Sequence, residues 1–151
     1  MPLNLYPLID GKLYQAGLLG DIEAFILQKP SLVIDCTHDM ALFGNFSPLF
    51  VKIPFYDGTF PIGTKGKELL NNIHSVARMA ALAIREGSKV LTHCNAGENR
   101  SSLVDGVILI NLRAMGLITF GSAVDFIRAK RPGALQNQSF AAYLNGQNGL
   151  T

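Results

Sequence analysis

Short apolar runs and longer periodic segments alternate along the chain. Four runs rich in branched and aromatic residues predict strands: KLYQAG at 12–17, SLVIDC at 31–36, LFVKIPF at 49–55 and SKVLTHC at 88–94. The runs at 31–36 and 88–94 are expected to be buried, and the second of them to be central in a sheet. KLYQAG is the first predicted strand of the chain.

Five segments carry the spacing or composition of helices. Between 67 and 87, apolar side chains recur at three- and four-residue steps and the segment ends at a glycine, as in an amphipathic helix that packs on a sheet. The strongly apolar segment 100–116 also stops at a glycine. The remaining predicted helices are 119–133, 137–146 and an early segment at 20–29 that Asp21 is placed to cap.

Strands that alternate with helices of this length predict an α/β fold, with a central, mostly parallel, twisted sheet of about four to five strands flanked by helices. No internal repeat or linker-like change in composition divides the 151 residues, so we expect one domain over 1–151. A hydrophobic fraction of 48% and a charged fraction of 16% are typical of a compact domain rather than a disordered chain.

The charge of the chain narrows the choice of partners only slightly. A formal net charge of +2 and one short basic run, at 128–131, do not indicate a nucleic-acid surface. The N-terminus lacks a basic start followed by an apolar stretch, and no segment has the ~18 apolar residues of a membrane span. We therefore expect a cytoplasmic, monomeric protein without a membrane partner.

The decapeptide HCNAGENRSS, at 93–102, lies where the strand at 88–94 gives way to the helix at 100–116. Open α/β sheets bind ligands at such strand ends. Gly97 lets the loop turn sharply so that successive N–H groups can converge on one anion, and Arg100 adds a fork that can hold two phosphate oxygens. The sequence therefore predicts that Arg100 clamps a phosphate held by a loop whose members are His93, Asn95, Ala96, Gly97, Glu98 and Asn99.

Cys94 lies at the base of this loop, six positions before Arg100. Helix N-termini and nearby cations favour the thiolate form of a cysteine, and a thiolate beneath a bound phosphate is a nucleophile aimed at phosphorus. Ser101 can donate its hydroxyl to the sulfur when the thiolate leaves, and His93 can hold the loop through a hydrogen bond to nearby backbone. The structural alternative is a buried strand-end cysteine with an incidental arginine.

These residues resemble the signature of the cysteine-dependent protein tyrosine phosphatase superfamily, in which His-Cys is followed by five residues, an arginine and a serine or threonine. KLYQAG, IPFYDGTFP and AVDFIRAKRPGALQNQSFAAYL are similar to the dual-specificity branch, so the resemblance covers nearly the whole chain. The Cys-Thr pair at 36–37 and the later Asp-Gly and GALQ segments are similar to the kinase-associated phosphatase group. The resemblance implies a parallel-centred sheet and a two-step dephosphorylation through a phosphocysteine, without metal or other cofactor.

Such a reaction requires an acid that protonates the leaving oxygen. The resemblance assigns this role to an Asp on a mobile loop upstream of the cysteine, and Asp57 in FYDGTFP matches it. The alternative is that Asp57 only begins a turn, as Asp-Gly pairs do. Asp35 and Asp39, which flank the earlier strand end, and Asp105, one turn into the helix, match less well.

Four further residues are candidates for the pocket or its regulation. Asn137 matches a polar position near the pocket in relatives, with Gln136 beside it, although both fit equally well as loop or capping residues. His38 either faces the pocket or occupies a turn. Cys36 ends a strand expected beside the catalytic strand; the resemblance makes it a candidate redox partner of Cys94, and a buried strand cysteine is the alternative. The three histidines lack the spacing of a ligand set, so we predict no metal site.

The signature constrains the reaction more than the substrate. Tyrosine-specific relatives are longer, so the main prediction is a shallow pocket that accepts phosphotyrosine and phosphoserine/threonine of proteins. Glu98 disfavours a phosphoinositide headgroup. Asn99 lies directly before the arginine, as an asparagine does in the similar RNA 5′-phosphatases. The Arg-Thr-Gly that ends the loop in those enzymes is absent here, and the weak positive charge of the chain does not favour RNA. An RNA 5′ end stays open as an alternative substrate. Glu98 also leaves open a phosphoprotein-binding module with weak turnover.

Overall fold

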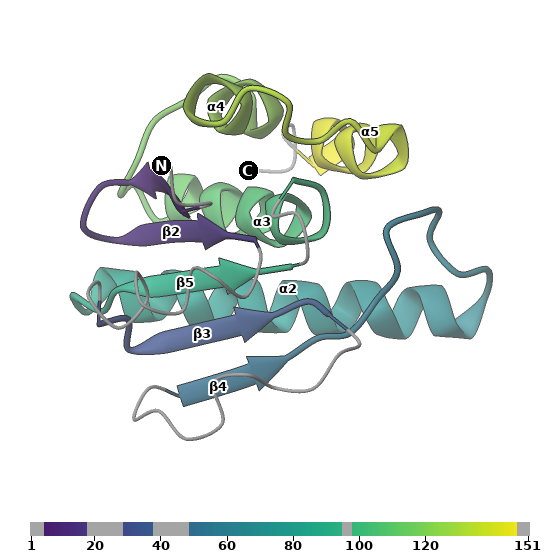
Figure 1. Cartoon of the computed structure of the whole chain (residues 1–151), viewed down its shortest axis with the longest axis horizontal. Coiled ribbons are helices and arrows are strands. Elements are labelled where there is room, and N and C mark those ends of the chain that lie inside the picture. The colour runs from purple at the N-terminus through teal and green to yellow at the C-terminus, as the bar shows by residue number, and fades with distance from the viewer. Residues whose placement is uncertain (1–4, 18–28, 38–48, 95–97, 148–151) are drawn as a thin grey trace.

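The computed structural model describes residues 5–17, 29–37, 49–94 and 98–147 (Figure 1). Within these ranges a sheet lies against helices, as the α/β prediction requires. The predicted helix at 20–29 falls almost wholly outside the described residues. So do His38, Asp39 and the loop residues Asn95, Ala96 and Gly97.

A five-stranded sheet forms the centre of the described structure, with strand order β1-β2-β5-β3-β4. Strands β2, β5, β3 and β4 run parallel, and β1 pairs antiparallel with β2 at one edge. The prediction of a mostly parallel sheet of four to five strands is therefore confirmed. The bounds are β1 (Leu5–Ile9), β2 (Leu13–Ala16), β3 (Leu32–Asp35), β4 (Leu49–Lys52) and β5 (Val90–His93).

Strand β1 is the strand that the hydrophobic pattern does not predict. Its run contains Pro7, which has no N–H to give to a ladder and is tolerated in sheets at edges and irregularities. The pairing with β2 accordingly shifts register between Pro7 and Ile9. The hairpin turns through Gly11, whose φ of 76° is left-handed, and the Gly11 N–H donates to the Tyr14 hydroxyl at 2.9 Å. The edge position is what lets a proline-containing run pair.

The described helices follow the predicted segments closely. Helices α2 and α3 end just before Gly87 and Gly116, which have left-handed φ values of 95° and 76°. Helix α2 begins at Thr64, one turn earlier than the apolar spacing predicts. Ser122 caps α4 by accepting the Asp125 N–H at 3.3 Å. The bounds are α2 (Thr64–Arg85), α3 (Arg100–Ala114), α4 (Ala123–Lys130) and α5 (Gln138–Gln147).

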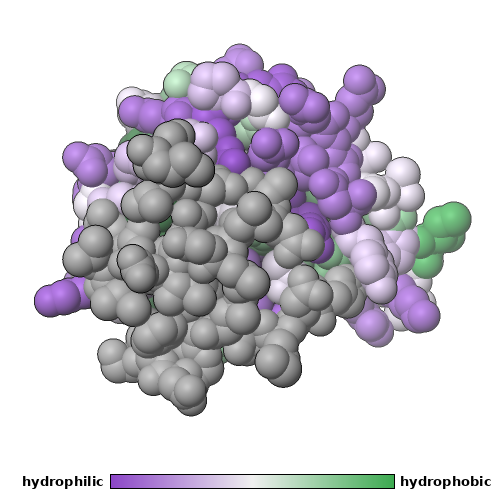
Figure 2. Space-filling view, viewed as in Figure 1, coloured by the Kyte–Doolittle hydropathy of each residue, from purple (hydrophilic) through white to green (hydrophobic). Residues whose placement is uncertain are grey.

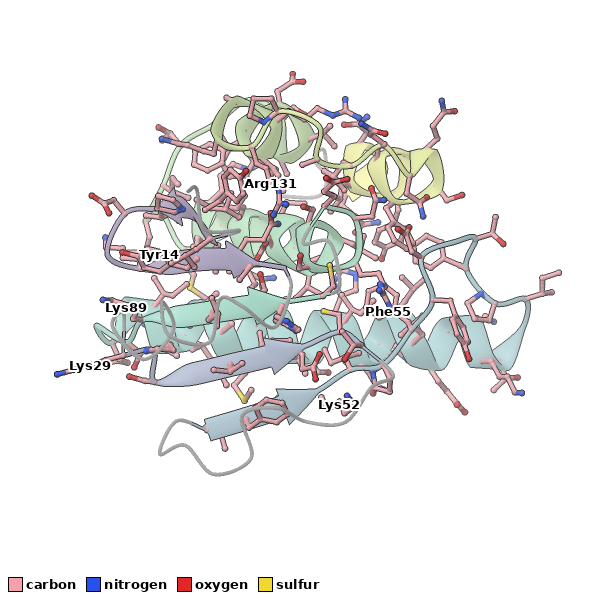
Figure 3. The ribbon with its side chains drawn as sticks, viewed as in Figure 1. Tyr14, Lys29, Lys52, Phe55, Lys89 and Arg131 are labelled. Atoms are coloured by element: carbon pink, nitrogen blue, oxygen red, sulfur yellow. The ribbon has the colours of Figure 1, made fainter. Side chains whose placement is uncertain are left out.

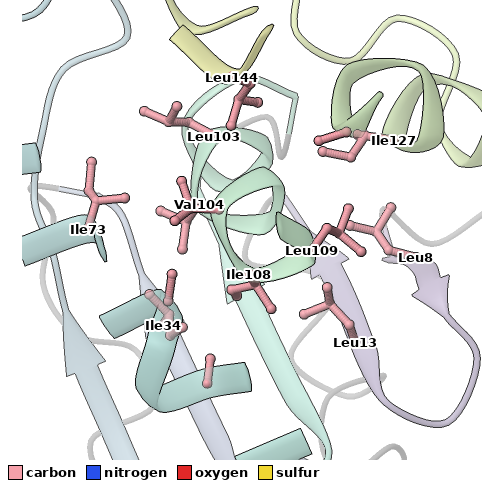
Figure 4. Packing of buried hydrophobic residues seen from close by; sticks show 14 of the residues in the cluster. Leu8, Leu13, Ile34, Ile73, Leu103, Val104, Ile108, Leu109, Ile127 and Leu144 are labelled. Carbon is pink, nitrogen blue, oxygen red and sulfur yellow. The ribbon is translucent and has the colours of Figure 1, made fainter. Parts of the chain in front are cut away.

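Helix α3 is buried on nearly every side, which explains why its sequence is apolar all round. It packs against α2 and the sheet on one side and against α4 and α5 on the other. Figure 4 shows Ile108 facing the sheet and Leu103 close to Leu144 of α5. Burial of each such aliphatic side chain contributes about 1.5–3 kcal/mol. The helix that follows the predicted phosphate loop is therefore rigidly anchored.

The face of the molecule over α4 and α5 is largely polar (Figure 2). In the space-filling view, hydrophilic residues cover most of the face over α4 and α5, and one hydrophobic projection lies at the edge beyond the start of α2 (Figure 2). Ile62, just before α2, is 96% exposed. Leu49, Tyr56 and Leu117 are also exposed, and exposed apolar side chains are ordinary on a protein surface. None of the described helices has both the length and the apolar character that crossing a membrane requires.

Candidate active site

The carboxyl ends of the parallel strands lie along one edge of the sheet, as the arrowheads in Figure 1 show. Strand β5 has a hydrogen-bonded neighbour on each side and ends at His93, directly before Cys94. The Cys94 N–H donates to Ala16 O of β2 at 3.3 Å, and the residue is 2% exposed. The predicted nucleophile is therefore held at the end of a central strand.

Arg100 and Ser101 come from the first turn of α3, at the far end of the predicted loop. Ser101 is fully buried, and its Oγ lies 3.2 Å from Cys94 Sγ. Arg100 Nη1 donates to Phe55 O at 3.2 Å. Figure 3 shows Phe55 on the segment between β4 and α2, which continues to Asp57. The structure thus joins the predicted loop to the segment that carries the predicted acid.

Asp57 is exposed, and its carboxylate accepts hydrogen bonds from two residues far away in the sequence. Asn99 Nδ2 donates to Oδ2 and Asn137 Nδ2 donates to Oδ1, each at 2.8 Å. Asn137 Nδ2 also donates to Gly58 O at 3.0 Å. The predicted acid, the last residue of the predicted loop and one of the two predicted pocket amides therefore meet. The other, Gln136, is exposed, and its role stays a prediction.

His93 is buried beside Asp35, which ends the neighbouring strand β3. His93 Nδ1 lies 3.4 Å from Asp35 Oδ1, and Lys52 Nζ lies 3.1 Å from Oδ2. Burial alone would raise the pKa of Asp35, but hydrogen bonds from His93, Thr37 and Lys52 outweigh it and lower the pKa to about 2. Asp35 is thus an ionised partner for the histidine, which the sequence analysis did not foresee.

Cys36 follows β3 as Cys94 follows β5. The Cys36 N–H donates to His93 O at 2.8 Å, and the pairing of Asp35 with His93 sets the two cysteines at equivalent positions on adjacent strands. This confirms that the strand before Cys36 adjoins the strand before Cys94. Burial, and then the charge of Cys94, raises the pKa of the Cys36 thiol. Both cysteines are reduced and buried, and their redox pairing stays a prediction.

A buried polar cluster next to the loop has no counterpart in the sequence analysis. Gln15 Nε2 donates to Ser102 Oγ at 2.7 Å and to Asp105 Oδ2 at 2.8 Å, and Gln15 Oε1 accepts from Arg131 Nη1 at 3.0 Å. Thr92 Oγ1 donates to Asp105 Oδ1 at 2.7 Å. Burial raises the pKa of Asp105 to about 7, against the hydrogen bonds from Thr92 and Gln15. These hydrogen bonds link β2, β5 and α3 to Arg131 at the end of α4, and Figure 3 labels Arg131.

The segment between α4 and α5 supports the loop from its outer side. Glu98 O accepts the Leu135 N–H at 2.9 Å, and Leu135 has a left-handed φ of 59°. Such a conformation costs a non-glycine residue roughly 1 kcal/mol. Arg128 holds it through hydrogen bonds to Ala134 O at 3.1 Å and Leu135 O at 2.7 Å. No short-range sequence signal reveals this support, because it depends on the docking of α4.

The fold and the loop place the protein in the cysteine-dependent protein tyrosine phosphatase superfamily. More particularly, the chain belongs to the family described as dual specificity phosphatase, catalytic domain, whose model matches residues 26–148. This span contains Asp57, Cys94, Arg100 and Ser101. The family predicted from the sequence is therefore confirmed.

Curated relatives and solved structures agree with this family. The chain is 29% identical over 115 residues to the protein tyrosine phosphatase domain-containing protein 1 of Bos taurus and 27% identical to that of Danio rerio, each over 74% of the chain. It spans only 14% and 16% of the length of those relatives. Human DUSP28 superposes with a TM-score of 0.77 at 19% identity, over 99% of this chain and 96% of that one. Tk-PTP in its active form superposes with a TM-score of 0.74 at 22% identity over the whole of both chains, which supports the fold.

Proposed function

We propose that this protein is a metal-independent phosphatase that hydrolyses phosphomonoesters on proteins through a phosphocysteine intermediate. The observation that supports the proposal best is the hydrogen bond from Asn99 to Asp57, because it brings the candidate acid to the loop that begins with the candidate nucleophile. A buried cysteine with an incidental arginine would not need a carboxylate fixed beside its loop. The loop amides and Arg100 bind the phosphate in this proposal.

In the first step, Cys94 Sγ attacks phosphorus and forms a P–S bond while the P–O bond to the substrate breaks. Asp57, in its protonated form, donates its proton to the leaving oxygen. Arg100 follows the equatorial phosphate oxygens and stabilises the charge that they carry in the transition state. The Arg100 bond to Phe55 O places this guanidinium next to the segment of the acid.

In the second step, the Asp57 carboxylate takes a proton from a water molecule that attacks phosphorus. The P–S bond breaks, and inorganic phosphate and the Cys94 thiolate are released. Ser101 Oγ, 3.2 Å from the sulfur, donates a hydrogen bond to the departing thiolate.

Phosphorylated protein side chains, both tyrosine and serine/threonine, are the proposed substrates. The names of the relatives at 27–29% identity point to phosphotyrosine, and the family name points to both classes. An RNA 5′ end, a phosphoinositide, and phosphoprotein binding with weak turnover are the alternatives that the experiment must separate.

The first experiment measures phosphate release from an aryl phosphate with chelator present, over about pH 5 to 8, for the wild type, Cys94→Ser and Asp57→Ala. The proposal expects chelator-resistant turnover that Cys94→Ser abolishes, and a slow Asp57→Ala variant that lacks the basic limb of the pH profile. Phosphopeptides, an RNA with a 5′-triphosphate and a phosphoinositide are then compared as substrates. No release by the reduced wild type, together with retention of a phosphopeptide, would overturn the proposal in favour of a binding module.

A further inference from the structure

Asn99 precedes α3 at the position where a side chain usually caps its own helix. Its side chain makes no such capping bond. Instead, Asn99 Oδ1 accepts the Asn137 N–H at 3.0 Å, and Asn99 Nδ2 donates to Asp57 Oδ2 at 2.8 Å. The backbone donor of Asn137 fixes the orientation of the Asn99 amide, so that its NH₂ group points at the carboxylate. The Asn99 side chain therefore bonds Asp57 instead of capping its own helix.

Asn137 has the same arrangement with different partners. Its Oδ1 accepts the Phe140 N–H at 3.2 Å and so caps α5, which again fixes the orientation of the amide. Its Nδ2 then donates to Asp57 Oδ1 at 2.8 Å and to Gly58 O at 3.0 Å. Two amides, each oriented by a backbone N–H, thus hold the two oxygens of one exposed carboxylate.

The segment that carries Asp57 also rests on an aromatic base. Phe55 and Phe60, on either side of the acid, lie against Phe140 with ring centroids 5.8 Å and 5.4 Å apart. Phe60 also packs against Tyr143, at 5.4 Å. These rings fix the ends of the segment on α5, but they do not orient the carboxyl group between them. The amides supply that orientation.

We propose that Asn99 and Asn137 are positioning residues that hold the Asp57 carboxyl group where it exchanges a proton with the leaving oxygen. The proposal rests on the proposed function. A carboxyl oxygen has two acceptor sites, so after accepting an amide N–H each oxygen of Asp57 still has a site that can carry the proton passed to the leaving oxygen. Because Asn99 belongs to the phosphate loop, the bond also sets the distance of the acid from the bound phosphate. Fixing an exposed side chain in this way removes rotamer freedom before the substrate arrives.

This role has a consequence for the choice of substrate. An ester with a poor leaving group, such as an alkyl or phenyl phosphate, needs protonation of the departing oxygen, whereas a nitrophenolate leaves readily without it. Loss of the amides therefore slows poor leaving groups selectively. A residue that only shapes the loop or stabilises α5 would slow both kinds of ester by the same factor.

The test compares kcat/KM for phenyl phosphate and p-nitrophenyl phosphate, since this ratio reports the steps up to phosphorylation of the cysteine. The variants are Asn137→Ser, which keeps an oxygen to cap α5, and Asn99→Ala, which removes no capping bond. Each is made alone and in an Asp57→Ala background, and Asn145→Ala, exposed on α5, is the matched control. We expect each variant to lose about tenfold with phenyl phosphate and about twofold or less with p-nitrophenyl phosphate.

In the Asp57→Ala background we expect Asn137→Ser and Asn99→Ala to have almost no further effect, because residues that act through Asp57 are coupled to it. Equal losses on both esters, or losses that persist without Asp57, would overturn the positioning role and leave the proposed function intact. No turnover by the wild type, or no loss of phenyl phosphate turnover in Asp57→Ala, would overturn this inference together with the acid role. Should Asn137→Ser fail to fold, Asn99→Ala decides the outcome by the same criteria.

Discussion

Ser101 Oγ lies 3.2 Å from Cys94 Sγ, and both residues are shielded from solvent. In the proposed mechanism this contact matters most when the sulfur becomes a leaving group, because a hydrogen bond to a thiolate is stronger than one to the sulfur of a phosphocysteine. We expect Ser101→Ala to lower kcat for p-nitrophenyl phosphate by roughly 10- to 100-fold with little change in kcat/KM. Rapid-quench measurements should then show a burst of nitrophenolate equal to the enzyme concentration.

A Ser101→Ala variant without a burst, whose kcat/KM falls as far as its kcat, would assign the serine to loop structure. Ser122→Ala serves as the control, because Ser122 caps α4 and does not contact the sulfur. Its kcat should stay at the wild-type value.

Cys36 and Cys94 follow adjacent parallel strands at equivalent positions, and neighbouring strands are about 4.8 Å apart, within the Cα range of disulfides. Peroxide would oxidise the Cys94 thiolate to a sulfenic acid, and the Cys36 sulfur would then displace water to form the disulfide. Because burial raises the pKa of the Cys36 thiol, this second step should accelerate as pH rises. We expect mass spectrometry to find an intramolecular disulfide whose reduction by dithiothreitol restores turnover.

The Cys36→Ser variant is the matched control for this oxidation. Without the second thiol, the sulfenic acid should proceed to a sulfinic acid that dithiothreitol does not reverse. Sulfinic acid on Cys94 of the wild type, with no disulfide, would show that Cys36 is only a buried strand residue.

Asp105 links pH to stability. Its pKa is about 7 in the folded state against an ordinary value of 3.8, so the folded protein binds more protons than the unfolded chain between these values. The free energy of unfolding should therefore fall as pH rises from about 4 to 7, at a slope approaching about 1.4 kcal/mol per pH unit from this group alone. Asp105→Asn, which cannot ionise, should lack this contribution.

Urea unfolding of the wild type and of Asp105→Asn across that range measures the difference, since all other titrating groups are common to both proteins. If the free energies of unfolding of the two proteins vary with pH in parallel, folding does not raise the pKa of Asp105 and the prediction is wrong. If the stability of the wild type falls relative to that of Asp105→Asn as pH rises toward 7, the prediction is confirmed.

Gly66 lies on α2 where the segment of the acid turns back toward the helix. A Cβ at this position would overlap the backbone carbonyl oxygen of Pro61. We expect Gly66→Ala to displace that segment, to cost about 1–3 kcal/mol of stability and to slow phenyl phosphate more than p-nitrophenyl phosphate. Gly146→Ala on α5, where an added Cβ meets nothing within 4 Å, is the control and should keep full turnover. Unchanged kinetics in Gly66→Ala would mean that α2 yields and the acid does not move.

The elements near the site were predictable where the relevant signal is local. Cys94 and Arg100 fall within one short motif, and α2 and α3 end at glycines with left-handed φ. Strand β1 was missed because Pro7 conceals an edge strand that exists through its pairing with β2. The contacts of Asp57 could not be foreseen, because 42 and 80 residues separate it from its partners and only the assembled fold brings them together. Gln15 was hidden in the same way, as a polar residue within an apolar strand.

Asp57 is exposed on a connecting segment, whereas Cys94 is embedded at the end of the central strand. A substitution of the aspartate therefore removes little packing, while a bulky substitution of the cysteine disturbs the core. Selection for folding alone would therefore constrain the buried position of Cys94 more than the exposed position of Asp57. A copy of such a domain could thus lose the carboxylate at position 57 and keep its fold, and it would be recognised by the presence of Cys94 and Arg100 without Asp57.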